Sequence, residues 1–225
     1  MPLDPKYRSI CFDMDGTLLN TKPRYDLMTQ TIFDEYVRLG VPKELVQQGG
    51  EKFDLEKGRD WIVENISLEA YEEIAVRTAP RMLELEMDGL TDAEEFPGVK
   101  GLLMKLRGMG YRIGVLTRGG RAYVDKALEK FDMAQYLDGV VARDDFNENE
   151  AKPNPMAMRH MADAIGVQPE EILYLGDHKM DYQCARSAGS GFIGVTSGTH
   201  SEDDWHIIDS EIIVLPTIAS LMDLI

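Results

Sequence analysis

The sequence predicts an α/β fold, a parallel sheet with helices on both faces that is interrupted once by a helical insertion. Along most of the chain, short apolar runs alternate with segments whose apolar residues recur at helical spacing. From about residue 20 to residue 95 this alternation stops, and helical patterns follow one another without a convincing strand. With 225 residues, 44% of them apolar, the chain can bury a sizeable core.

The first apolar run covers residues 8–15. It is apolar at Ile10, Cys11, Phe12 and Met14 and ends in acids and a glycine, as expected for a buried strand that leads into a functional loop. Similar runs, each predicted as a strand, recur at 111–117, 139–144, 172–177, 192–196 and 211–215. Helical spacing between them is clearest over 99–106 and 124–131. This order of elements predicts the parallel sheet.

The insertion begins with an apolar stripe over 25–37, which follows Pro23 and stops at Gly40. A second helical pattern over 68–83 has Ser67 as its N-cap and Pro80 as a kink. We therefore predict a core domain made of 1–19 and 96–225 and a helical domain over 20–95. The turns at 19–22 and 94–98 would be the hinges.

The composition argues against some classes of binding partner and some cellular locations. Lys and Arg total 24 against 40 Asp and Glu, and the resulting charge of −16 argues against binding nucleic acid or an anionic membrane. No apolar run exceeds four residues and residues 1–15 lack a signal-peptide core, so we expect a soluble, cytoplasmic protein. Cys11 and Cys184 are expected to be buried reduced thiols, and the four histidines lack the spacing of a zinc site.

The first predicted strand ends in Asp13-Met14-Asp15-Gly16-Thr17-Leu18. Side chains alternate along a strand, so Asp13 and Asp15 should point the same way at its carboxyl end, where open α/β sheets hold ligands. Two ionised carboxylates at such a short distance repel each other, so they need a cation or a shared proton between them. Mg²⁺ is the natural cation for such oxygen ligands. The alternative is a solvated acidic turn.

Polar residues also mark the ends of later strands. Thr117, followed by two glycines after Arg118, offers a hydroxyl and exposed amides to phosphate oxygens. Lys152 precedes a proline, and Asp177 and Asp181 stand four apart after a buried run. Each residue taken singly also has an ordinary structural interpretation. Thr117 would be a structural threonine, Lys152 a surface lysine, and Asp177 and Asp181 helix N-cap acids.

Together the motifs resemble those of the haloacid dehalogenase-like phosphohydrolases. The match comprises DMDGTL at 13–18, VLT ending at Thr117, AKPNP around Lys152 and GDHKMD at 176–181, in that family's order. The insertion also resembles the α-helical cap domain that the family places after its first strand. The resemblance implies a Rossmann-like core with this cap and a small phosphorylated metabolite as substrate.

The resemblance also implies roles. Asp13 would be the nucleophile and form an aspartyl phosphate, and Asp15 would be the general acid and then the general base. Thr117 and Lys152 would hold the phosphoryl oxygens.

For the metal, the resemblance implies Mg²⁺ bound by the Asp13 carboxylate, the Asp15 backbone carbonyl and Asp177. Asp181 would lie in the outer shell or reach the ion through water.

A Mg-dependent phosphomonoester hydrolase similar to phosphoglycolate phosphatase is thus expected, as a monomer or homodimer. Asp15 argues against the dehalogenases, which lack an acid there. The alternatives are a phosphotransferase or phosphomutase of the same family, a catalytically silent binding protein, or a signalling receiver module. A receiver is much shorter and lacks the DxDGT arrangement.

Substrate choice is assigned to the insertion. Lys52, Lys57 and Arg59 concentrate positive charge in an otherwise acidic chain and are candidate substrate contacts, as is Arg118 in the core. The alternative is solvated surface charge. Asn20-Thr21 and Arg118 depart from residues common in the family. These departures leave the chemistry implied by the resemblance intact but weaken what it implies about substrate identity.

Overall fold

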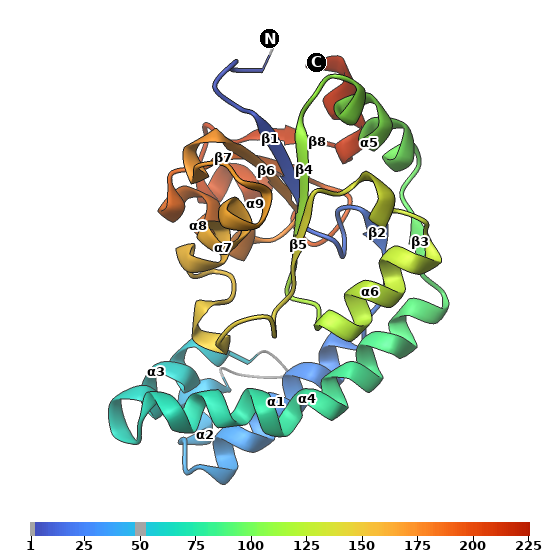
Figure 1. Cartoon of the computed structure of the whole chain (residues 1–225). Helices are drawn as coiled ribbons and strands as arrows, with labels where there is room; N and C mark the ends of the chain where they lie inside the picture. Colours follow the sequence, from blue (N-terminus) through green and yellow to red (C-terminus); the bar gives the residue numbers. More distant parts are fainter. Residues whose placement is uncertain (1–2, 48–52) are drawn as a thin grey trace. The chain divides into compact units, whose positions relative to one another are not determined.

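The computed structural model describes residues 3–47 and 53–225 (Figure 1). By its internal contacts the chain divides into two compact units. Met1–Thr21 and Ala93–Ile225 form the first, and Lys22–Asp92 forms the second. No helix in the described ranges is long and apolar enough to cross a membrane.

The first unit is built on a six-stranded sheet in the order β5-β4-β1-β6-β7-β8, and every neighbouring pair is parallel. This confirms the predicted fold class. The central strands are almost wholly buried because helices cover both faces. The strands are β1 (Ser9–Phe12), β4 (Arg112–Leu116), β5 (Gly139–Val141), β6 (Ile172–Gly176), β7 (Gly191–Val195) and β8 (Ile213–Leu215).

The strand order places the functional edge of the sheet. The chain runs from β1 through β4 to β5 toward one edge and from β6 through β7 to β8 toward the other. Because such crossovers are right-handed, the helices of the two halves cover opposite faces. The direction of winding reverses between β1 and β6, and open α/β sheets bind ligands beyond the carboxyl ends of the strands at such a point. The helices are α5 (Val99–Gly108), α6 (Arg121–Lys130), α7 (Pro155–Ile165), α8 (Lys179–Ala188) and α9 (Glu202–Ile208), with short 3₁₀ turns at Ala134–Tyr136, Glu148–Glu150, Pro169–Glu171 and Ile218–Asp223.

One face of the sheet carries a core formed with α7 and α8. Met158 and Met161 of α7 pack there with Tyr174 of β6, and all three are fully buried. Cys11 and Cys184 belong to the same core as free thiols, which confirms that prediction.

A two-stranded antiparallel ribbon, β2 (Leu19–Asn20) with β3 (Glu94–Glu95), joins the points where the chain leaves and re-enters the first unit. The expectation of no strand within 20–95 was therefore wrong at Asn20 and at Glu94–Glu95. Two residues are too few to show the alternation by which a strand is recognised in sequence.

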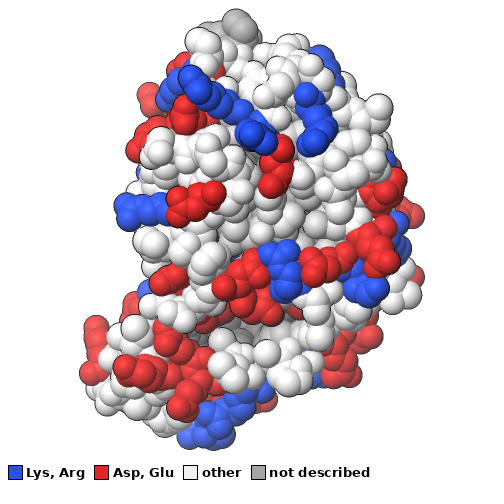
Figure 2. All heavy atoms as spheres, viewed as in Figure 1, with Lys and Arg blue, Asp and Glu red and all other residues white. Residues whose placement is uncertain are grey.

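In its described residues, 22–47 and 53–92, the second unit contains four helices, α1 (Tyr25–Arg38), α2 (Lys43–Val46), α3 (Leu55–Asn65) and α4 (Leu68–Thr91). Phe33, Ile62 and Ile74 lie in their shared core. The Ser67 side chain accepts a hydrogen bond from the Ala70 N–H, as its predicted N-cap role requires, and α4 continues through Pro80. The face in Figure 2 carries more acidic than basic side chains, in keeping with the net charge of −16.

Candidate active site

Three of the predicted site residues directly follow three adjacent strands of the sheet. Asp13 follows β1, Thr117 follows β4 and Asp177 follows β6. Phe12 is in register with Val115 on one side and Leu175 on the other, so the three loops start at the same level of the sheet.

A buried cluster of acids forms at this edge. Asp13, Asp177 and Asp181 each offer a carboxylate oxygen within 4.8 Å of the others. Their relative exposures are 7%, 3% and 1%, so water compensates little of their charge.

Lys152 is the buried cation of this cluster. Its Nζ donates to Asp13 Oδ1 at 2.7 Å and to Asp181 Oδ1 at 2.6 Å. Burial raises the pKa of Asp13, and the Lys152 charge opposes that rise. The pKa of Lys152 is itself raised, because the attraction of Asp13 and Asp181 outweighs the effect of burial. One ammonium and three carboxylates leave the cluster short of two positive charges when all are ionised.

Tyr174 completes the surroundings of Lys152, and sequence reasoning missed it. Its hydroxyl accepts from Lys152 Nζ at 2.9 Å and donates to the Leu116 carbonyl at 2.6 Å. In the sequence Tyr174 is one residue of an apolar strand, and nothing there indicates that its hydroxyl binds a charged group.

Asp177 is held by loops that are far apart in sequence. Thr17 Oγ1 donates to its Oδ1 at 3.2 Å, and the Thr199 N–H donates to its Oδ2 at 2.7 Å. A Cβ at Gly16 would lie 2.6 Å from Oδ2, and one at Gly198 would overlap the carboxylate. Both glycines therefore let the backbone approach Asp177. The Ser197–Thr199 loop was not predicted, although Gly198 between two hydroxyl residues after a strand was an available signal.

Asp181 has both carboxylate oxygens engaged. Oδ1 accepts from Lys152, while Oδ2 accepts from the His178 N–H at 3.0 Å in a capping box at the start of α8. These contacts favour an orienting role for Asp181 toward Lys152.

Asp15 sits beside the cluster and is partly buried. Its Oδ1 accepts hydrogen bonds from the Tyr123 hydroxyl at 2.5 Å and from Thr21 Oγ1 at 2.7 Å. Burial raises the pKa of Asp15, and these two hydrogen bonds oppose the rise. Tyr123 was not singled out from the sequence, where it reads as part of an apolar helix face.

Two predicted residues lie in the loop after β4. Thr117 is buried, and its Oγ1 accepts from the Gly119 N–H at 3.0 Å. Arg118 forms an ion pair with Glu148 at 2.6 Å and donates to the Lys152 carbonyl at 3.3 Å. It therefore braces the Lys152 loop, and Glu148 offsets its charge.

The predicted cations of the second unit have acidic neighbours. Lys57 pairs with Asp54 at 3.0 Å, and Arg59 pairs with Asp60 at 2.7 Å. Lys52 lies outside the described residues.

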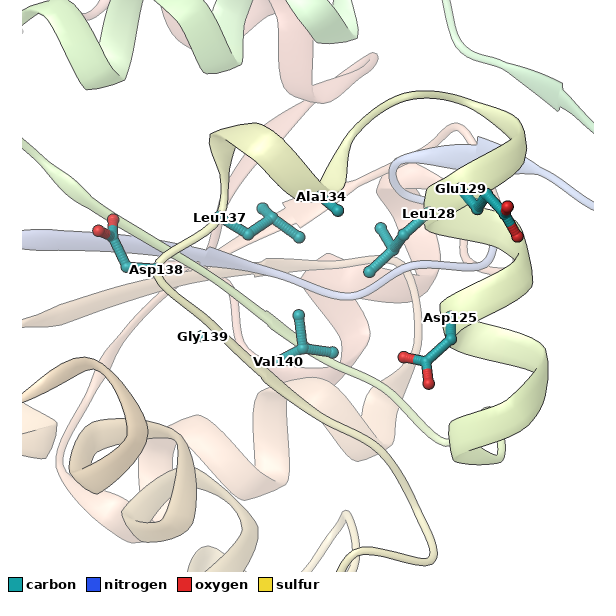
Figure 3. A pocket seen from close by; sticks show the side chains of 8 residues that line it. All are labelled: Asp125, Leu128, Glu129, Ala134, Leu137, Asp138, Gly139 and Val140. Carbon is teal, nitrogen blue, oxygen red and sulfur yellow. The ribbon is translucent and has the colours of Figure 1, made fainter.

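A cavity of about 530 Å³ opens elsewhere, between α6 and the edge strand β5 (Figure 3). Its lining combines apolar side chains with acids, and Asp138 pairs with Arg112 at 3.0 Å, Asp125 with Arg121 at 3.2 Å and Glu129 with Lys126 at 2.6 Å. None of the residues that line it belongs to the acidic cluster. Asp13 and Asp177 of that cluster lie instead directly after β1 and β6.

Similarity to known proteins covers most of the chain. The sequence model of one protein family, described as "Haloacid dehalogenase-like hydrolase", matches residues 10–195. The phosphoglycolate phosphatase of Nitrosospira multiformis is 28% identical over 218 residues, spanning 92% of this chain and 91% of the relative. That of Mannheimia succiniciproducens is 26% identical, spanning 90% and 95%.

Solved structures share the fold. A haloacid dehalogenase-superfamily hydrolase from Geobacter sulfurreducens aligns with a TM-score of 0.60 at 20% identity, covering 97% of this chain and 100% of the other. A phosphatase of the same superfamily from Thermococcus onnurineus aligns with a TM-score of 0.57 at 21% identity, covering 96% of each chain.

Proposed function

The chain belongs to the haloacid dehalogenase-like hydrolases, and we propose that it hydrolyses a small phosphomonoester with Mg²⁺ through a phosphorylated Asp13. The observation that carries the proposal is the buried contact of Lys152 with both Asp13 and Asp181, beside Asp177. Burying four charged groups together is costly, and their chemistry matches that of phosphoryl transfer.

The donor set fits a hard divalent cation. As possible ligands the three acids offer only carboxylate oxygens, and the cluster lacks two positive charges when fully ionised. Gly16 and Gly198 let the backbone lie against the Asp177 carboxylate and so help to fix its position. Asp13, Asp177 and the Asp15 backbone carbonyl would hold the ion, with Asp181 orienting Lys152. When bound, Mg²⁺ supplies positive charge against the phosphate oxygens.

In the first half-reaction, an Asp13 carboxylate oxygen forms a bond to phosphorus as the ester oxygen leaves with its electron pair. Asp15 gives its proton to that oxygen. In the second, Asp15 takes a proton from water as the water oxygen bonds to phosphorus, and the bond between phosphorus and Asp13 breaks. Thr117 and Lys152 support the phosphoryl oxygens throughout.

Substrate selection is proposed for the second unit, Lys22–Asp92, acting as the cap. The similar proteins named as phosphoglycolate phosphatases support a short, anionic phosphomonoester. Arg118 contributes less than its charge suggests, because Glu148 pairs with it.

The test is phosphate release from a panel of phosphorylated metabolites by the purified protein. We expect EDTA to abolish turnover, Mg²⁺ to restore it, and Ca²⁺ to replace it poorly because it prefers more ligands at longer distances. Asp13→Asn should abolish turnover without lowering the thermal unfolding midpoint, since it removes the nucleophile at constant volume.

Asp163→Asn on the exposed side of α7 is the matched control and should remain fully active. Full activity of a metal-free sample, or of a deamidation-free Asp13→Asn sample, would refute the proposal.

A further inference from the structure

We propose that Tyr123 is a positioning residue that orients the Asp15 carboxylate, so that Oδ2 is the oxygen that exchanges the proton. The inference rests on the proposed function, in which Asp15 is the general acid and base. It deepens that function by assigning the proton to one atom and the orientation to a residue of α6.

The contact is long-range, and it joins a fully buried tyrosine to a partly buried carboxylate. Tyr123 has 0% exposure, and its hydroxyl donates to Asp15 Oδ1 at 2.5 Å although 108 positions separate the two residues. Buried phenols need a hydrogen-bond partner, and phenylalanine would fill the same space without that need. The hydroxyl at this position therefore has a specific consequence for Asp15.

The ring is fixed from the loop after β4. A Cβ at Gly119 would lie 2.8 Å from the Tyr123 ring, so the glycine leaves the ring its space. Arg121, two residues earlier, is anchored by its N–H to Asp144 Oδ1 at 2.6 Å and by its Nε to Asp145 at 2.9 Å. The same loop carries Thr117. Tyr123 thus links the position of Asp15 to the strand end assigned to the phosphoryl oxygens.

Both donors reach the same oxygen of Asp15. Thr21 Oγ1 donates to Oδ1 at 2.7 Å, beside the Tyr123 hydroxyl. Within residues 3–47 and 53–225, no hydrogen bond reaches Oδ2. Two donors on one oxygen restrict rotation of the carboxylate and leave the other oxygen for the leaving group and water. Proton transfer requires such defined geometry.

The experiment compares two leaving groups in the metal-loaded, full-length enzyme. Tyr123→Phe removes only the hydroxyl. We expect kcat/KM for propyl phosphate, whose alkoxide needs a proton, to fall about tenfold, the effect of one lost hydrogen bond to a charged group. For p-nitrophenyl phosphate, whose leaving group needs none, kcat/KM should change less than about twofold. The kcat/KM comparison concerns the first half-reaction, because kcat/KM reports the steps up to departure of the alcohol and does not include hydrolysis of the phosphorylated enzyme.

Tyr182→Phe is the matched control. Tyr182 also donates to a carboxylate, Asp209 Oδ2 at 2.7 Å, in the same unit, and its loss should leave both kcat/KM values unchanged. Thr21→Val removes the other hydrogen bond to Asp15 Oδ1, from a residue outside α6. It should lower kcat/KM for propyl phosphate selectively, as Tyr123→Phe does. Thr21→Ser, which keeps the hydroxyl, should not.

Equal losses on both esters in Tyr123→Phe and Thr21→Val would show a packing role and overturn the inference, as would no loss on either. In those cases an active wild type leaves the proposed function standing. A wild type that releases no phosphate from either ester would overturn the proposed function and the inference with it.

Discussion

One ion pair of the first unit and one of the second have similar lengths but differ sharply in burial. In the first unit, Lys152 contacts Asp181 at 2.6 Å with 2% of each side chain exposed. In the second, Lys57 contacts Asp54 at 3.0 Å with 46% and 33% exposed. The first pair joins residues 29 positions apart, whereas the second joins positions three apart at the start of α3.

The two pairs differ in what they cost the free energy of folding. Water solvates the exposed pair, so its formation and loss alter the free energy of folding little. Around Lys152, water is excluded, and the protein must supply every counter-charge and hydrogen bond. A cluster of that kind is poor evidence of stabilisation. It indicates chemistry that needs the charges where they are.

The largest effect is expected for Lys152→Met, which keeps most of the unbranched side chain and removes the ammonium group and its charge. Asp13 and Asp181 would lose their buried partner, so we expect about 3 kcal/mol less stability in metal-free urea unfolding at neutral pH. We also expect kcat/KM to fall about 1,000-fold, because the phosphoryl oxygens lose a fixed cation.

Lys126→Met is the matched control, since Lys126 also forms a 2.6 Å pair, with Glu129, at 60% and 71% exposure. It should leave the urea midpoint and kcat/KM unchanged. Equal losses of stability in the two variants would mean that burial does not separate these pairs.

A smaller effect is expected where the backbone approaches the buried cluster. Gly198→Ala would place a Cβ against the Asp177 carboxylate, which the Thr199 N–H holds at 2.7 Å. Displacing Asp177 should raise the Mg²⁺ concentration for half-maximal activity by about 10- to 100-fold, as changes around metal ligands do.

Gly108→Ala, where the added Cβ meets nothing within 4 Å, is the control for Gly198→Ala. Its Mg²⁺ dependence should match that of the wild type. An unchanged Mg²⁺ requirement in Gly198→Ala would show that the Ser197–Thr199 loop does not position a metal ligand.

Sequence reasoning reached the sheet and the charged cluster because both leave strong local signals. Buried strands are apolar runs, and Asp13, Lys152 and Asp177 stand in short motifs at strand ends. Tyr123 and Tyr174 were missed because a tyrosine inside an apolar pattern reads as core, and its hydroxyl partner is set only by the tertiary fold. The acids beside Lys57 and Arg59 were visible in the sequence, but whether they pair depends on helix geometry.

The smallest effect is expected for the three cations of the second unit that the sequence predicts as substrate contacts. Triple replacement of Lys52, Lys57 and Arg59 by Ala should raise KM for an anionic metabolite, because remote substrate groups bind through the proposed cap. Asp54 and Asp60 already neutralise part of the charge of Lys57 and Arg59, so we expect only about a two- to fivefold change, as for solvated charges. p-Nitrophenyl phosphate, which has no remote anionic group, should show no change in KM.

Arg81→Ala, which breaks an exposed pair with Glu84 at 2.6 Å in the same unit, is the control and should alter neither KM. Equal losses on both esters would assign the three cations to folding of the second unit. No loss on either would leave them as solvated surface charge, and then the contrast with Lys152 would extend to function as well as to burial.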